Sequence, residues 1–258
     1  MAIVLLVPAA HAQQQGEPSL DVLLVRLQAS LDDYRTSIPH FFCSEHIVSR
    51  YQRQYGVEIK TTIESVFRLD HREPPQKDPR LNLTEDHELK SVNKVPVHRD
   101  SFPQTVPIMS YGVFSNAVSV VSSEMAPCYD YTLRPNVKFD GHPVIDIEFK
   151  YKPEMAKNER CVPIDSSGRA IYDAATLHPV RIEMNVPHVE VFPQSKLYGL
   201  WRWRIDYVPI TFDEREFWLP GKINSRLDRE NQVSSWFFEA TYSNYHKLTV
   251  KSRIVPDE

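Results

Sequence analysis

The spacing of the apolar residues changes from a helical to a strand-like period at Pro39. Between residues 20 and 34, leucines and a tyrosine recur every three or four positions, which is typical of the buried face of an amphipathic helix. Ser19 is a candidate N-cap, and proline ends such a pattern. After it, alternate side chains face opposite ways, as in a β-strand, with one side formed by Cys43, Glu45, Ile47, Ser49 and Tyr51. The chain therefore starts with a helix that leads directly into a long strand.

Most of the remaining chain alternates with the strand period. Further strands are expected at residues 57–69, 85–97, 129–139, 144–151, 170–173, 176–186, 198–210, 216–227 and 235–254. Residues 113–121 are compatible with a strand or a short helix, and we favour the helix because apolar residues recur there at turn spacing. About ten strands and one helix predict a mainly β (α+β) fold, a large curled antiparallel sheet or incomplete β-barrel wrapped over the N-terminal helix.

The Asp140-Gly141 pair predicts a hairpin turn. A simple two-residue turn places Leu133 opposite Glu148. An odd-length loop, or a bulge at Gly141, places Leu133 opposite Ile147 instead. Because the second register buries one apolar face, it is the one we expect.

Composition and charge exclude some classes of function. The chain has 258 residues and a net charge of −4, so it lacks the basic footprint of a nucleic-acid-binding protein. It has only 7 glycines and contains neither GxGxxG nor GxxxxGK[ST]. We therefore expect no nucleic-acid partner and no cofactor.

The N-terminus resembles an export signal. Residues 1–7 are apolar, and Ala10-His11-Ala12 fits a small-x-small cleavage site. A basic region before the apolar run is missing, which indicates a signal peptide truncated at its start. The alternative is an N-terminal strand or a chance apolar start. We expect a signal peptide at 1–12, a flexible leader at 13–18, and a single domain at 19–258 with a loop insertion around 71–107. No later run reaches the ~18 apolar residues of a membrane span, so the expected protein is periplasmic or secreted and does not span the membrane.

Three cysteines remain for an oxidising compartment, and they allow three single pairings. Cys128 and Cys161 flank one predicted hairpin, so this pair is the favoured disulfide. Cys43 alternates with core residues and is expected to be buried.

Patterns typical of catalysis and metal binding are missing. The chain contains no HExxH, HxH, CxxC or GxSxG. Cys43 and His46 lie three residues apart on a strand and so point to opposite faces. The run Glu85-Asp86-His87-Glu88 holds possible metal ligands, but on a polar segment it is expected to be a solvated face. We expect no enzyme, no catalytic residue and no metal, while a zinc site assembled from distant strands stays open.

Three segments resemble known exported proteins. IPHFFCSEHIVSRY at 38–51 is similar to a motif of uncharacterised exported proteins of acidobacterial type. GRAIYDAATLHPVRIEMNV at 168–186 and ITFDEREFWLPGKINSRL at 210–227 are similar to strand motifs of the periplasmic lipoprotein-carrier and lipoprotein-sorting superfamily. This resemblance implies an incomplete antiparallel barrel over a helix, with an apolar cavity for acyl chains and no catalytic residue. The inserts at 71–107 and 186–196 depart from the compact carriers.

Aromatic residues follow alternate positions of the late strands, and most of them are expected to fill the core. In the functional interpretation, part of this face stays open and binds an apolar ligand between sheet and helix. The candidate ligand-binding residues are Leu24, Leu27, Leu31, Ile147, Phe149, Trp201, Trp203, Tyr207, Trp236 and Phe238. Expected partners are a lipid, acyl chain or lipoprotein. The first alternative is a structural or interaction module of the envelope that binds a protein through the 71–107 loop, and an exported hydrolase is a distant third.

Overall fold

The computed structural model describes residues 18–52, 56, 58–75, 82–97, 112–158, 161, 165–192, 197–229 and 234–248. The expected signal peptide and all but the last residue of the expected leader lie outside the described residues. So does the end of the last expected strand, beyond residue 248.

The amphipathic segment forms helix α1 (Leu20–Ser37), which leads into strand β1 (Phe41–Gln52). Its buried side chains include Leu23, Leu27 and Leu31, which share one face as the leucine spacing predicts. The expected side-chain cap is wrong, because the Ser19 side chain makes no capping hydrogen bond and its backbone carbonyl accepts the N–H of Leu23 at 3.0 Å. The helix ends just before Pro39, as residues preceding proline disfavour the helical region.

The remaining elements are mostly strands. They are β2 (Ile59–His71), β3 (Leu83–Val92), β4 (Val95–Pro96), β5 (Tyr129–Arg134), β6 (Lys138–Phe139), β7 (His142–Tyr151), β8 (Ser167–Asp173), β9 (Pro179–Phe192), β10 (Leu197–Phe212), β11 (Arg215–Arg229) and β12 (Ser235–Lys247). The short helices are α2 (Val113–Asn116) and the 3₁₀ helices η2 (Ala117–Val121), η3 (Ala126–Cys128) and η4 (Pro153–Lys157). The helix favoured at 113–121 is therefore confirmed.

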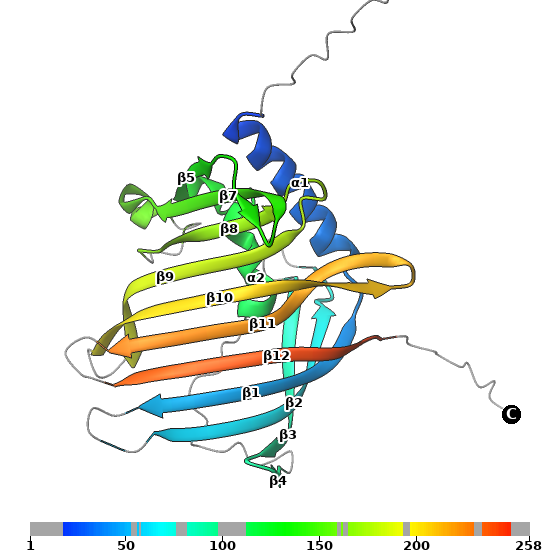
Figure 1. Ribbon diagram of the computed structural model, residues 1–258, viewed down its shortest axis with the longest axis vertical. Coiled ribbons are helices and arrows are strands. Elements are labelled where there is room, and N and C mark those ends of the chain that lie inside the picture. Colours follow the sequence, from blue (N-terminus) through cyan, green and yellow to red (C-terminus); the bar gives the residue numbers. More distant parts are fainter. Residues whose placement is uncertain are drawn as a thin grey trace, which may run out of the picture.

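Within the described residues the strands form one 12-stranded sheet, in the order β4-β3-β2-β1-β12-β11-β10-β9-β8-β7-β5, with β6 paired to β7. All of these pairings are antiparallel. The first strand pairs with the last, β1 with β12, and this pairing joins the β1–β4 and β5–β12 runs into one sheet (Figure 1). The predicted curled antiparallel sheet over an N-terminal helix is confirmed.

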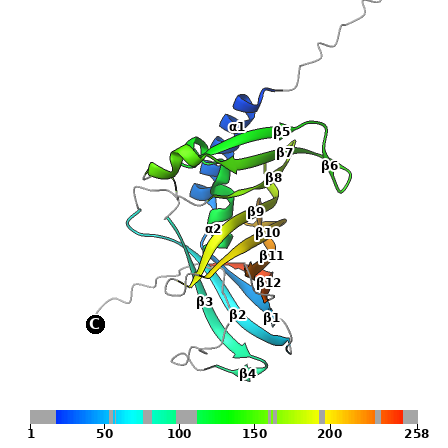
Figure 2. The same ribbon diagram turned by 90° about the vertical axis from the view of Figure 1, so that its left-hand side faces the viewer.

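Both helices lie on one side of the sheet, which we call the inner face. Figure 1 views the opposite, outer face, and Figure 2 shows α1 and α2 together on the inner side of the strands. In β10, Trp203, Ile205 and Tyr207 are buried, and the alternating Arg202 and Arg204 are more exposed. The expectation that alternate aromatic residues fill the core is confirmed for Trp203 and Tyr207 of this strand.

Helix α2 covers the inner face beside β1 and β2. Its Phe114 ring lies 4.4 Å from the ring centroid of Phe67, 5.1 Å from that of Tyr242 and 6.0 Å from that of Phe41. Aromatic pairs at such distances contribute packing energy beyond the area they bury. This aromatic cluster fixes α2 against strands that come from both ends of the chain.

The hairpin has the expected register, with Leu133 opposite Ile147. The extra residue that produces this register does not lie at Gly141. The two residues Asp140 and Gly141 form a direct turn, with φ of 47° and 84°. The chain departs from regular pairing between β5 and β6, at residues 135–137, where Pro135 has no N–H to donate to the sheet. The expected single strand over 129–139 is therefore interrupted.

Ser167-Gly168 resembles a turn in the sequence, but both residues belong to β8, which begins before the strand expected at 170–173. Any side chain at Gly168 would collide with the carbonyl oxygen of Glu183 on β9 and with the Phe149 ring on β7. Glycine marks a close approach between strands here. The turn lies after Asp173 instead, where Leu177 has a φ of 63°.

Cys128 and Cys161 form the expected disulfide, with Cα atoms 5.7 Å apart, and Cys43 is free and buried as expected. Burial raises the pKa of the Cys43 thiol, and the charge of Glu45 raises it further. The disulfide links the start of β5 to the segment that follows η4.

We predict that the double variant Cys128→Ala/Cys161→Ala loses about 3–4 kcal/mol of unfolding free energy, because the bridge spans 33 residues of chain. The measurement is urea unfolding with and without dithiothreitol. The wild type should lose stability when reduced, and the double variant should not respond. Equal curves for oxidised and reduced wild type would contradict the prediction.

Candidate functional site

The ligand-binding residues predicted from the sequence lie on the inner face and on α1. Buried members are Leu27, Leu31, Ile147, Phe149, Trp203, Tyr207 and Phe238, and partly buried members are Leu24, Trp201 and Trp236. Leu27 and Leu31 line one small cavity under α1. Trp203 and Phe238 contribute to the floor of a basin that opens on the outer face. Contact of these residues with a ligand stays a prediction.

The cavity under α1 is small. It has a volume of about 20 Å³, enough for about one water molecule. Its lining includes Tyr172 and His178, and among the described residues the Tyr172 hydroxyl and His178 Nδ1 are buried without a hydrogen-bond partner. Burial raises the pKa of Tyr172 and lowers that of His178. At this point α1 packs closely on the sheet.

A larger hollow lies at the N-terminal end of α1, and we call it the helix groove. Its volume is about 320 Å³, within the usual range of ligand pockets. The lining is mainly apolar and consists of Pro18, Leu23, Leu133, Pro135, Val137, Pro143, Val144, Ile145 and Ala174, together with Arg26, Arg134 and Asn136. Figure 2 shows α1 beside β5 and β7 at this end of the sheet.

The sheet edge explains why the groove is open. Strand β5 is the last strand of the sheet on this side and ends at Arg134. Pro135 interrupts the edge strand there, so among the described residues no further strand extends the sheet beyond Leu133. Helix α1 closes one wall through Leu23 and leaves the remainder uncovered.

The two arginines of the groove differ in their surroundings. Arg134 lies 3.8 Å from Asp146 and 3.6 Å from Glu148. Asp146 is also held by Arg169, which donates from Nε and Nη2 to its two carboxylate oxygens at 3.0 Å and 2.5 Å. Arg26 is exposed and has no ion pair or hydrogen bond with any side chain among the described residues. The groove therefore carries one uncompensated positive charge.

The sequence analysis missed most of the groove residues because it treated the 129–151 hairpin as regular. The available signal was Pro135, since a proline inside a strand pattern indicates an edge strand or an interruption. Where an edge strand carries apolar side chains beside an amphipathic helix, part of the apolar face of the sheet is left uncovered.

A second group of polar residues lies buried on the inner face near α2. Glu45 Oε2 lies 2.8 Å from His87 Nδ1 and accepts a hydrogen bond of 2.6 Å from the Ser65 hydroxyl. Glu85 Oε2 lies 4.0 Å from His87 Nε2 on the other side of the ring. The side chains of Glu45, His87 and Glu85 are 0%, 6% and 4% exposed. The expected solvated face at 85–88 is thus wrong for Glu85 and His87.

Glu85 also fixes the start of α2. Its carboxylate accepts hydrogen bonds from the backbone N–H of Gly112 at 2.8 Å and of Ser115 at 2.7 Å, and from the Ser115 hydroxyl at 2.6 Å. Backbone N–H groups at the start of a helix have no partner within the helix, so a carboxylate satisfies them well. The buried polar cluster therefore links β1 and β3 to α2.

The charge of His87 depends on these carboxylates. Burial alone lowers the pKa of His87, but the hydrogen bond and charge of Glu45, with the charges of Glu85 and Asp86, outweigh burial and raise it. Burial, followed by the charge of Glu45, raises the pKa of Tyr242. Among the described residues, no group of three or more His, Cys, Asp or Glu side chains is arranged to hold a metal ion.

Comparisons with known proteins give similarity in fold. No family model and no curated protein matches the chain. A LolA superfamily protein from Nitrosomonas europaea is similar, with 11% identity and a TM-score of 0.38, over 88% of this chain and 94% of that chain. An outer membrane lipoprotein-sorting protein domain from Vibrio parahaemolyticus has 10% identity and a TM-score of 0.40, over 89% and 92%. A DUF1329 family protein from Desulfovibrio piger has 13% identity and a TM-score of 0.39, over 90% and 92%.

Two of these structures carry names from the lipoprotein-carrier and lipoprotein-sorting superfamily that the sequence motifs resemble. At this identity and TM-score the similarity supports no conclusion on ligand or activity. The likeness to acidobacterial proteins stays a prediction. Among the described residues, no helix has both the length and the apolar character needed to cross a membrane.

We predict that stability falls as the pH rises above neutrality, because a raised pKa of His87 stabilises the folded state only while the imidazole is protonated. This contribution is complete below the unfolded-state pKa of about 6.5 and is lost as the pH passes through the folded-state pKa. Urea unfolding at about pH 6 and about pH 9 measures the loss of this stability. The expected loss is about 1.4 kcal/mol for each unit by which the folded-state pKa exceeds the unfolded-state pKa. His87→Gln should lessen the dependence, whereas His46→Gln, at an exposed pair with Glu64, should retain it. A wild-type stability that rises over this range would contradict the prediction.

Proposed function

We propose that this chain is a non-enzymatic binding protein for an amphipathic ligand, an apolar chain that ends in an anionic group. The ligand lies in the helix groove between the first turns of α1 and strands β5 and β7. The observation that supports this most strongly is an open hollow of about 320 Å³ with a mainly apolar lining and the uncompensated Arg26.

The magnitudes agree with such a ligand. Each buried CH₂ group contributes about 0.8 kcal/mol, so an acyl chain that buries several of them overcomes part of the cost of association. Arg26 is exposed, and an exposed ion pair contributes about 0.2–1 kcal/mol. Affinity therefore comes from the apolar lining, and the arginine sets the preference for an acidic end group.

The chemistry of the lining favours binding over catalysis. Its polar side chains are two arginines and one asparagine, with no carboxylate, imidazole, thiol or hydroxyl among them. General acid–base or nucleophilic catalysis needs such groups in contact with the substrate. A hydrolase centred on the helix groove has no support from these residues.

The aromatic residues predicted from the sequence are a separate part of the proposal, because they do not line the helix groove. Trp201 and Trp236 are only partly buried, whereas Leu27 and Leu31 under α1 are buried. Partly exposed aromatic surface is suited to contact with an apolar chain. Trp201 and Trp236 therefore keep a proposed role as secondary contacts of the ligand.

Export and an envelope partner belong to the same proposal. The apolar start of the chain and the Cys128–Cys161 disulfide both suit an oxidising compartment outside the cytoplasm. The insertion at 71–107 is the proposed contact for an envelope protein. Its described part includes β3 and β4, and residues 76–81 and 98–107 lie outside the described residues.

We predict that Leu133→Trp, which adds bulk to the inner-face lining of the helix groove, weakens binding of the fluorescent fatty acid cis-parinaric acid about tenfold or more, equivalent to about 1.4 kcal/mol. Arg26→Gln should weaken binding of the acid about two- to fivefold, since an exposed ion pair is lost. It should leave binding of the methyl ester unchanged, because the ester carries no charge. Fluorescence titration of the full chain measures both ligands.

The matched control is Val25→Trp, which places the same side chain on the exposed side of α1, where Val25 is 64% exposed. Circular dichroism confirms that each variant is folded. The proposal is wrong if the folded wild type gives no saturable signal, or if Val25→Trp and Leu133→Trp weaken binding equally.

A further inference from the structure

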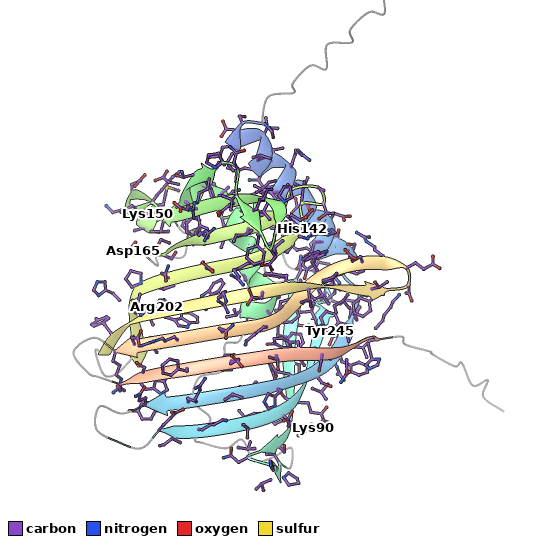
Figure 3. All side chains as sticks on the ribbon, viewed as in Figure 1. Lys90, His142, Lys150, Asp165, Arg202 and Tyr245 are labelled. Atoms are coloured by element: carbon purple, nitrogen blue, oxygen red, sulfur yellow. A yellow bond between two sulfur atoms is a disulfide. The ribbon has the colours of Figure 1, made fainter. Side chains whose placement is uncertain are left out.

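A basin of about 360 Å³ opens on the outer face, away from the helix groove. It crosses β9, β10, β11, β12 and β1, and Figure 3 views this face with Arg202 labelled. Its outer-face lining includes Val48, Arg50, Glu183, Asn185, Arg202, Arg204, Asn224, Arg226, Phe237 and Glu239. Four arginines thus line a hollow that a ligand of moderate size fills.

Three of these arginines and an aromatic ring form one line across the sheet, which we call the arginine row. Arg202 on β10 pairs with Arg226 on β11, Arg226 with Phe237 on β12, and Phe237 with Arg50 on β1. Neighbouring strands lie about 4.8 Å apart, so Arg202 and Arg226 are close neighbours. Like charges directly opposite each other destabilise a sheet, so this arrangement requires compensation.

The carboxylates of the chain neutralise the charge of the arginine row only in part. One carboxylate, Asp228, serves two arginines: Arg202 Nη2 lies 2.5 Å from Oδ2, and Arg226 Nε lies 2.7 Å from Oδ1. Arg50 lies 3.8 Å from Glu58, and both of these side chains are about half exposed. Exposed ion pairs of this kind contribute little.

The same sharing occurs beside the row. Asp206 lies 3.2 Å from Arg204 Nε and 2.5 Å from Arg181 Nε, so it too serves two arginines. Two further carboxylates line the basin: Glu183 lies 4.0 Å from Arg181, and Glu239 lies 2.8 Å from Lys222. The arginine row itself has three arginines against the two carboxylates Asp228 and Glu58, so it keeps one positive charge in excess.

The terminal nitrogens of the guanidinium groups indicate which kind of ligand suits the basin. The ion pairs of Arg50, Arg204 and Arg226 use Nε, which leaves their terminal nitrogens outside these pairs. The side chains of all four arginines are between 43% and 48% exposed, so they remain accessible to a ligand. Terminal guanidinium nitrogens form strong paired hydrogen bonds with phosphate and carboxylate oxygens.

Phe237 holds the row in place. The guanidinium carbon of Arg226 lies 4.8 Å from its ring centroid and that of Arg50 lies 5.8 Å away. Stacking on one ring restricts both side chains before any ligand arrives, which lowers the entropy cost of binding.

We propose that the arginine row is a binding site for a phosphate-bearing ligand, in which two or more oxyanion groups bridge Arg202, Arg226 and Arg50. The phosphate groups belong to a free molecule or to a lipid headgroup. This site is separate from the helix groove, because it lies on the other face of the sheet.

The test measures binding of inorganic pyrophosphate to the full chain by isothermal titration calorimetry. It also measures co-sedimentation with phosphatidylcholine vesicles, with and without phosphatidylglycerol. The variants are Arg50→Gln and Arg226→Gln, and the matched control is Arg68→Gln, an exposed arginine on the outer side of β2 outside the basin. Leu133→Trp tests independence from the helix groove.

If the ligand is free phosphate, pyrophosphate binds saturably and each basin variant weakens this binding about tenfold, which corresponds to about 1.4 kcal/mol. Arg68→Gln and Leu133→Trp leave pyrophosphate binding within about twofold. If the phosphate must sit on a lipid, only vesicles with phosphatidylglycerol bind, with the same order of variants. The proposal is overturned if neither probe binds, or if Arg68→Gln weakens binding as much as the basin variants.

Discussion

The structure depends on the one-sidedness of its sheet. An antiparallel sheet with one apolar face must cover that face, and here the cover comes from two separate helical segments. Helix α1 packs through Leu23, Leu27 and Leu31, and α2 with η2 packs through Phe114 and a run of buried small residues. Where this cover is close, the inner face is filled. Where it ends, at the edge strand β5, an apolar groove remains.

The short helix α2 requires a stronger attachment than its few residues provide. Glu45, Glu85 and His87 supply it by placing ionisable groups in the aromatic core. Burying charge is costly unless each group is paired and hydrogen-bonded, and loss of one partner leaves the others uncompensated. The cluster meets this condition through Ser65, Ser115 and the backbone at the start of α2. The position of α2 is therefore set by specific hydrogen bonds together with the packing of Phe114.

Local rules predicted the parts of the fold that depend on neighbouring residues. The alternation in β1 and β10, the helix at 20–34, the turn at Asp140-Gly141 and the Cys128–Cys161 bridge follow from spacing along the chain. Gly168 resembles a turn in the sequence, but it is required by the approach of Glu183 from the next strand. Glu85 and His87 look solvated on a polar strand, but their partners are distant in the chain: Glu45 lies 42 residues before His87, and Ser115 lies 30 residues after Glu85. Contacts between distant segments are what local patterns leave out.

Both proposed sites arise from such distant contacts, and each strand of the sheet contributes to both faces. In β10, Trp203 is buried on the inner face between the outward-facing Arg202 and Arg204, and it also belongs to the floor of the basin. A change of the Trp203 side chain therefore acts first on the inner packing. Arg226 and Arg50 lie on the outer face, so changes of their side chains leave the inner packing in place. The alternation that makes the sheet one-sided is thus also what keeps an apolar site and a cationic site apart in one layer of strands.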